Sequence, residues 1–500
     1  MPQSIVENKE SRSSYRSIFK ATSLFGGVQV YTILIRIIRS KIVALFLGPF
    51  GIGVQGLYQS ALDLVKHATS LGIAQSAVRD VAEANGTGDA HRVSTIITVL
   101  HRIVWFTGLL GMVVVIAASP ILSKTSFGDN THILPFIILS VILLIEQLSV
   151  GQKVVLQGLR RMKDLAKASA IGATISLVLT VPFYIIWKVD GIVPALIVSA
   201  LVAMSVSWYY SRKVKFSPVR ISFRETVSEG KNMIVMGFFM SITSLLTMAV
   251  SYVLRSLIRK WGGTEDVGLF QAGFVIMNTY VGLVFNAMAT DYYPRLAAIN
   301  KDNEKCNETI SHQGEVSVLI LAPLLILCII AMPLIIRILY SDQFLPIGGY
   351  IKWACLGMMF RLIAWLISYT FVAKADSKLF AINETVANFL YLALSLVGYR
   401  LWGLTGLGIA FFVQYILYFL QVFLIAKFRY GFRFTRTFIK VYLVQLLVVV
   451  ASFLTIMLVP GPARFVLGSL LLVVSAFVSI RGLNSRLDLR AILQRGGARS

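Results

Sequence analysis

The sequence has few charged residues, and few of those are acidic. Only 14% of its 500 residues are charged, whereas about 25% is usual for a soluble domain. Apolar residues take their place: they make up 57% of the chain, and the mean hydropathy is +0.77. Apolar runs long enough to cross a bilayer recur from residue 21 to residue 481. Because these runs are continuous rather than alternating, the sequence predicts an all-α polytopic membrane protein.

Motifs that mark catalysis or cofactor binding are also missing. The three cysteines, Cys306, Cys328 and Cys355, form no C-x-x-C pair and are interpreted as structural. The sequence contains no phosphate-binding loop G-x-x-x-x-G-K-[ST], no paired Cys/His ligands and no G-x-S-x-G nucleophile elbow. It therefore predicts a protein that is not an enzyme and that binds no cofactor or metal.

About fourteen membrane spans are predicted, and Lys and Arg are concentrated in alternate loops. By the positive-inside rule, both termini then lie in the cytoplasm. The net charge of +24 follows from this bias, with some attraction to anionic lipid, so it does not indicate nucleic acid. The predicted organisation is a cytoplasmic tail (1–20), an N-terminal six-helix bundle (21–211), a cytoplasmic linker (212–231), a C-terminal six-helix bundle (232–427), two extra transmembrane helices (438–481) and a basic cytoplasmic tail (482–500).

The two predicted bundles show an internal repeat with a constant offset of 215 residues. Trp187 and Gly191 precede the sixth span as Trp402 and Gly406 precede the twelfth, and other short matches share this offset. Because each bundle has an even number of spans, both enter the membrane from the same side. The repeat is therefore predicted to be parallel, with a pseudo-twofold axis along the membrane normal.

Polar residues recur at helical spacing in the first two predicted spans of each bundle. Two interpretations remain open. These side chains hydrogen-bond between helices or pair locally, as Asp63 and Lys66 would, or they line a water-filled cavity between the halves. The repeat favours the cavity, and the excess of cations in it predicts an anionic substrate. The predicted substrate-binding residues are Arg36, Arg39, Gln59, Asp63, Lys66, Arg255 and Asn278.

Two further charged residues lie deep within predicted spans. Glu146 in the fourth span and Arg361 in the tenth span are separated by the same 215 residues. Together with Asp63, they are candidates for ion coupling or for a pair across the two halves.

Three segments resemble the Wzx-type O-antigen flippases, in the polysaccharide-transporter branch of the multidrug/oligosaccharidyl-lipid/polysaccharide (MOP) exporter superfamily. They are RSKIVALFLGPFGIGVQGLYQ at 39–59, EDVGLFQAGFVIMNTYVGLVFNAMATDYYPRLA at 265–297, which contains Y-P-x-L, and AKADSKLFAINE at 373–384. The resemblance covers residues 17–427. It implies a fold similar to that of multidrug (MATE) transporters, in which two six-helix bundles face each other in a V.

The resemblance also implies a function. A flippase of this kind moves an undecaprenyl-pyrophosphate-linked oligosaccharide, the repeat unit of O-antigen or a related surface glycan, from the inner to the outer leaflet of the bacterial inner membrane by alternating access. It implies that the pyrophosphate sits against the cations of a central cavity, that a proton or sodium gradient drives transport, and that membrane lipids, a glycan polymerase and a chain-length regulator are partners.

The last two predicted spans depart from the twelve that are usual in this branch. Fourteen spans resemble the lipid II flippases. A lipid II flippase, or a cation-coupled small-molecule antiporter of the same superfamily, therefore remains the alternative, as does a non-transporting member of a glycan assembly complex.

Overall fold

The computed structural model describes residues 3–214 and 219–487. Most of the predicted basic tail at 482–500, and part of the predicted linker at 212–231, lie outside these residues. The described chain is built from helices, without a strand, so the predicted all-α class is confirmed. It forms two compact units, Met1–Val267 and Gly268–Ser500.

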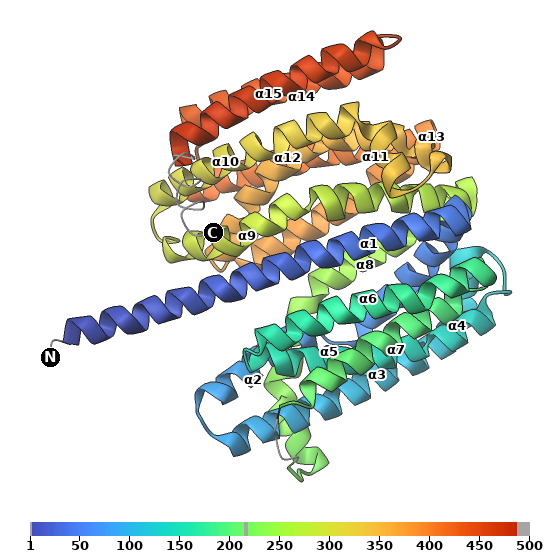
Figure 1. Ribbon diagram of the computed structural model, residues 1–500, viewed down its shortest axis with the longest axis vertical. Helices are drawn as coiled ribbons and strands as arrows, with labels where there is room; N and C mark the ends of the chain where they lie inside the picture. The colour runs from blue at the N-terminus through green and yellow to red at the C-terminus, as the bar shows by residue number, and fades with distance from the viewer. Residues whose placement is uncertain (1–2, 215–218, 488–500) are drawn as a thin grey trace. The chain divides into compact units, whose positions relative to one another are not determined.

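The first unit is a bundle in which α1 packs against α3 and α6, while α5 packs against α2, α3 and α7 (Figure 1). Its buried core includes Ile73 of α2, Ile97 of α3, Val155 of α5 and Met233 of α8. The elements of this unit are α1 (Gln3–Thr69), α2 (Ile73–Gly86), α3 (Ala90–Phe127), α4 (Ile133–Leu139), α5 (Val141–Gly158), α6 (Met162–Ile186), α7 (Ile192–Ser211) and most of α8 (Phe223–Val275).

The second unit is organised around α10, which packs against α12 and against the two last helices, α14 and α15 (Figure 1). The three cysteines are buried here and unpaired. After the end of α8, its elements are the π-helix η1 (Ile276–Val281), α9 (Leu283–Ala298), α10 (Asn303–Ile330), α11 (Met332–Leu339), the 3-10 helix η2 (Asp342–Ile347), α12 (Gly348–Ala373), α13 (Ser377–Tyr430), α14 (Arg436–Leu458) and α15 (Ala463–Leu487).

Ten helical segments of the described chain are long and apolar enough to cross a membrane. Ser377–Tyr430 contains two of the predicted spans, 379–401 and 404–426, and Met233–Phe285 covers most of two others, 232–258 and 267–293. The first predicted span, 21–47, and most of the second, 51–78, lie in α1, which is not among these ten. Helices α1, α8 and α13 are each interrupted by non-helical backbone, at Gly48, at Gly263 and at Trp402–Gly403.

The backbone supports the predicted repeat at the points where its helices break or turn. Three pairs of residues with positive φ are each separated by the offset of the repeat: Gly48 (62°) and Gly263 (86°), Arg160 (56°) and Ala375 (57°), and Lys188 (48°) and Gly403 (57°). Positive φ is uncommon outside glycine, so three coincidences at one offset indicate that both halves share one backbone path. At Gly48 and Gly263, ψ is near 180°, a conformation that is essentially restricted to glycine.

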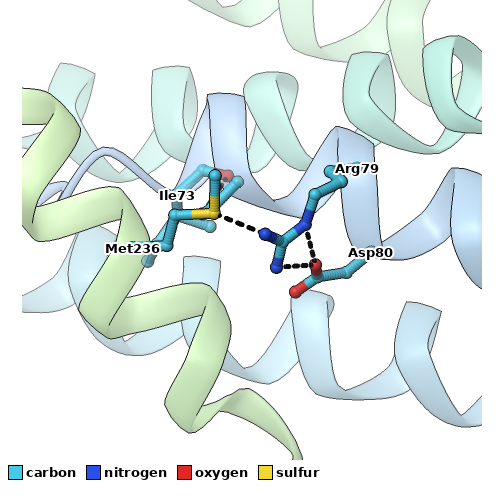
Figure 2. A network of polar contacts seen from close by, with 5 residues as sticks. Ile73, Arg79, Asp80 and Met236 are labelled. Carbon is cyan, nitrogen blue, oxygen red and sulfur yellow. Dashed lines mark hydrogen bonds and ion pairs between the residues drawn. The ribbon is translucent and has the colours of Figure 1, made fainter. Parts of the chain in front are cut away.

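The compact units divide at a different place from the predicted bundles. Most of α8, which begins the second repeat, belongs to the first unit. Within this unit, Gly72 and Gly237 approach each other by their backbones. An ion pair also joins α3 to α8, with Arg92 Nη1 2.6 Å from Glu229 Oε2. Figure 2 shows Arg79, whose guanidinium binds Asp80 and reaches Met236 Sδ at 2.7 Å. The two predicted bundles are defined by the sequence repeat, whereas the compact units are defined by packing. The division of the bundles at 212–231 therefore stays a prediction.

The start of α8 falls inside the predicted linker. Ser222 Oγ accepts the backbone N–H of Glu225 at 3.1 Å, and Glu225 Oε2 accepts the backbone N–H of Ser222 at 2.6 Å. This is a capping box of the type S-x-x-E. The same hydrogen bonds hold the pKa of Glu225 below its usual value, so the carboxylate stays ionised at the positive end of the helix dipole.

Candidate substrate-binding site

A group of charged side chains joins α1 and α5 in the first unit. Lys66 Nζ lies 2.8 Å from Glu146 Oε2 and 3.9 Å from Asp63 Oδ1. The three side chains are 30%, 37% and 38% exposed, in the order Lys66, Glu146, Asp63. The predicted local pairing of Asp63 with Lys66 is thus present, but the shorter contact is to Glu146.

Two more cations lie within electrostatic reach of this group. Lys153 follows Glu146 by two helical turns on α5 and interacts with both Glu146 and Lys66. Arg255 of α8 interacts with Asp63. The Arg255 side chain is only 6% exposed, and its Nη1 donates to the backbone oxygen of Ser251 at 3.0 Å and also to the Ser251 hydroxyl. The first unit therefore gathers residues from α1, α5 and α8 into one charged group.

The two arginines of the first span differ in their surroundings. Arg39 Nη2 donates to Tyr184 OH at 3.3 Å, and its Nη1 donates to Ser199 Oγ at 3.4 Å. Ser199 is in turn 2.7 Å from Ser176 Oγ. Arg36 is exposed, and so is Gln59. The sequence predicts one shared face for Arg36 and Arg39, whereas the structure directs Arg39 to α6 and α7.

In the second unit, Asn278 and Arg361 form a hydrogen-bonded pair. Arg361 Nη1 donates to Asn278 Oδ1 at 2.6 Å, and Asn278 Nδ2 donates to the carbonyl of Phe274 at 3.2 Å. Asn278 lies in the π-helix η1, and such short π segments often occur at functional sites. The guanidinium carbon of Arg361 is also 5.4 Å from the ring centres of both Phe285 and Tyr415, within cation–π range.

A second polar group lies beside this pair within α13. Tyr418 OH donates to the Glu384 carboxylate and accepts from Asn383 Nδ2 at 3.1 Å. Asn383 Oδ1 accepts from Gln421 Nε2 at 2.7 Å, and Glu384 interacts electrostatically with Arg361. Tyr415, Tyr418 and Gln421 are not among the residues predicted from the sequence. Their spacing of three residues on one helix face was visible, but aromatic residues at this spacing usually indicate packing.

The repeat relates the charged groups of the two units. The offset that relates Glu146 to Arg361 also relates Asp63 to Asn278. In the first unit the equivalent positions carry two carboxylates around Lys66, and in the second they carry an arginine bonded to an amide. One pair of equivalent positions, Glu146 and Arg361, thus holds groups of opposite charge, and the other replaces the carboxylate of Asp63 by the neutral amide of Asn278.

Each member of the proposed cross-half pair has a partner in its own unit. Glu146 binds Lys66, and Arg361 binds Asn278. The direct pairing of Glu146 with Arg361, and the role of Asp63, Glu146 and Arg361 in ion coupling, stay predictions.

The loop that precedes α4 carries two ionisable residues outside the membrane spans, and one of them, His132, contacts α1 and α3. His132 Nδ1 lies 2.5 Å from Tyr58 OH, and its ring stacks on Phe127 at 3.7 Å. Burial lowers the pKa of His132, whereas hydrogen bonds from Thr131 lower the pKa of Asp129. At neutral pH, His132 is therefore uncharged and Asp129 is ionised.

Comparisons with known proteins show which sequences this chain resembles. A family model described as polysaccharide biosynthesis protein matches residues 42–348. The lipid III flippase of Escherichia coli (strain K12) is 20% identical over 384 residues, which cover 76% of this chain and 91% of that protein. The lipid III flippase of Shigella flexneri matches to the same extent.

Solved structures of transporters share the fold at low sequence identity. The lipid II flippase MurJ in an inward closed conformation superposes with a TM-score of 0.66 at 15% identity, and the match covers 93% of this chain and 99% of that one. An inward-facing multidrug resistance MATE family transporter of the MOP superfamily has a TM-score of 0.65 at 15% identity, with 79% and 94% covered. The chain therefore has the fold of the MOP superfamily and belongs to the polysaccharide biosynthesis protein family.

Proposed function

We propose that this protein is a flippase for an undecaprenyl-pyrophosphate-linked oligosaccharide. The cargo is the repeat unit of O-antigen or of a related surface glycan, and it moves from the inner to the outer leaflet of the bacterial inner membrane. The observation that carries this proposal is the match to the lipid III flippase, which extends over 91% of that relative. A match over nearly the whole relative, rather than over one bundle, supports a common transport function.

The charged side chains support an anionic cargo. The first unit supplies Lys66 and Arg255, and the second unit supplies Arg361. Arg36 is exposed on α1 and adds a further cation. Phosphate oxygens bind such groups through charge-assisted hydrogen bonds, which are stronger than neutral ones, and arginine binds them in a bidentate manner. We expect the pyrophosphate to occupy a cationic central cavity that includes these residues.

The repeated backbone supports alternating access as the mechanism. Two halves with one backbone path can rock against each other around a binding site placed between them. Carboxylates in a membrane protein are costly and commonly serve ion pathways, so Asp63 and Glu146 are our candidates for coupling to a proton or sodium gradient. In this proposal both termini lie in the cytoplasm, and a glycan polymerase and a chain-length regulator act on the flipped product.

One observation favours a second candidate, a lipid II flippase. The MurJ structure covers 93% of this chain, whereas the MATE structure covers 79%, so the MurJ match takes in more of the described helices. The two cargoes share the polyprenyl pyrophosphate and differ in the attached sugars.

A deletion strain tests the proposal and separates these cargoes. Loss of the gene is expected to remove a surface glycan and to accumulate its lipid-linked repeat unit on the cytoplasmic face, while peptidoglycan synthesis continues. Lysis with accumulation of lipid II would instead establish the second candidate. A strain that keeps every surface glycan and accumulates neither lipid would refute both.

A further inference from the structure

The contact between Lys66 and Glu146 indicates the state of the candidate site when no substrate is bound. The two groups are 2.8 Å apart, the length of a charge-assisted hydrogen bond. Both side chains remain about one third exposed. The pair is therefore formed but not enclosed, and an incoming anion can reach Lys66 without unfolding the bundle.

Each charge around this pair has an oppositely charged neighbour. Asp63 and Glu146 are acidic and interact with Lys66, while Lys153 interacts with Glu146 and Arg255 interacts with Asp63. A group of this kind is tolerated in a membrane helix because no charge is left without a partner. It also holds a bound anion weakly, since every carboxylate competes for the same ammonium groups.

The second unit lacks such a carboxylate at the equivalent position. There the repeat places Arg361, whose hydrogen-bond partner is the neutral Asn278 amide. This neutral partner does not cancel the charge of the guanidinium, and the carboxylate that interacts with Arg361, Glu384, is hydrogen-bonded to Tyr418 instead. The two units thus differ in charge at one position of the repeat, where the first unit has the acidic Glu146 and the second has the basic Arg361. This difference indicates a specific role for Glu146.

We propose that Glu146 is a built-in counter-anion that occupies Lys66 in the empty site and is displaced by the pyrophosphate of the substrate. This inference rests on the proposed function, because it requires an anionic cargo. Displacement lets the site release its cargo: when the anion leaves, Glu146 takes back Lys66. Glu146 is in this respect a residue that sets substrate affinity.

The test measures binding of inorganic pyrophosphate to the full chain in lipid nanodiscs by calorimetry. Glu146→Gln keeps the size of the side chain and removes its charge. It is expected to bind pyrophosphate roughly tenfold more tightly than the wild type, which corresponds to about 1.4 kcal/mol. Asp63→Asn removes the more distant carboxylate, at 3.9 Å, and is expected to give a smaller gain.

Glu229→Gln is a matched control. Glu229 is also 37% exposed and also forms a close ion pair, with Arg92 at 2.6 Å, but it lies outside the membrane spans. It is expected to bind pyrophosphate as the wild type does. In the double variant Lys66→Met/Glu146→Gln the gain is expected to vanish, because the ammonium group that the anion would bind is gone.

The outcomes separate this inference from the proposed function. A Glu146→Gln protein with unchanged or weaker pyrophosphate affinity overturns the inference, and thermal melting of each variant excludes a loss of fold as the cause. If Glu146→Gln unfolds, an unchanged affinity in Asp63→Asn overturns it instead. A protein that shows the expected order of affinities but moves no lipid-linked glycan would refute the proposed function and leave the role of Glu146 intact.

Discussion

At the scale of single residues, three cationic side chains within the predicted membrane spans each have a polar partner on another helix. Arg39 binds Tyr184 and Ser199, Lys66 binds Glu146, and Arg361 binds Asn278. A charged side chain at a helix centre costs about 2.5–3.5 kcal/mol on insertion scales. Hydrogen bonds offset part of this cost, so a partner indicates how each helix tolerates its charge.

The different surroundings of Arg36 and Arg39 lead to a prediction. Arg39→Ala removes hydrogen bonds to α6 and α7 and is expected to lower the free energy of unfolding by about 1–2 kcal/mol. Arg36→Ala is expected to leave stability nearly unchanged and to slow flipping, because the exposed Arg36 side chain is a proposed contact of the pyrophosphate. Thermal melting of the purified variants and glycan display in a complemented deletion strain measure the two effects.

Lys41→Ala serves as the comparison for transport, since Lys41 lies on another face of α1 and is expected to affect flipping less. Normal glycan display with both Arg36→Ala and Arg255→Ala, at normal membrane abundance, would contradict a cationic site at these residues.

At the scale of elements, the repeat extends to a close approach of backbone to backbone that occurs in both halves. A Cβ atom at Gly191 would collide with the backbone oxygen of Phe183, and a Cβ atom at Gly406 would collide with that of Gly398. Phe183 and Gly398 are themselves equivalent in the repeat. In both halves, the absence of a side chain at this glycine therefore allows two backbone segments to come into contact at the same turn.

Substitution at these glycines has a predictable cost. Gly191→Ala and Gly406→Ala are each expected to destabilise the protein by about 1–3 kcal/mol, because the added methyl group has no room. Gly172→Ala is the control, since its Cβ would lie 4.0 Å from Val206 Cβ. In a helix interior that change is expected to be neutral or to stabilise by up to about 1 kcal/mol. Equal melting temperatures in all three variants would argue against the close approach.

At the scale of the whole molecule, the last two helices are part of the packing of the second unit. Phe438 of α14 packs against Gly314 of α10, and Gly468 of α15 packs against Ile330. Gln445 joins α14 to α15 through hydrogen bonds to Ser475 and Ser479, at 2.7 and 3.0 Å. The helices that extend beyond the twelve-span repeat thus cover one side of α10.

Removal of residues 436–500 is therefore expected to lower the melting temperature by several degrees. The physical reason is that α10 loses tightly packed neighbours and exposes that side to lipid. A chain that ends after Leu487 retains both helices and is the control. A truncated protein that melts with the control would show that α14 and α15 dock without stabilising the unit.

The sequence predicted the fold class and the repeat from simple physical signals. Long apolar runs require helices in lipid, and Trp187 with Trp402 already showed the offset that Gly48 and Gly263 share in the backbone. The sequence did not predict that α8 begins at Phe223 or that it packs on α2. A capping box and a backbone contact such as that between Gly72 and Gly237 hardly change the hydropathy profile from which the spans were predicted.

The charged residues also were predictable in part: their positions on each helix follow from the sequence, but their partners do not. Helical spacing alone brought Asp63 and Lys66 together, and it placed Arg36 beside Arg39. Which charge meets which group depends on the side chains of neighbouring helices, and the sequence does not order those helices in space. The sequence by itself thus determined the helices, the repeat and the charges that they carry. Only the tertiary structure decided that Lys66 meets Glu146, that Arg361 meets Asn278 and that Arg39 turns to Tyr184, because such pairs form by packing between segments far apart in the chain.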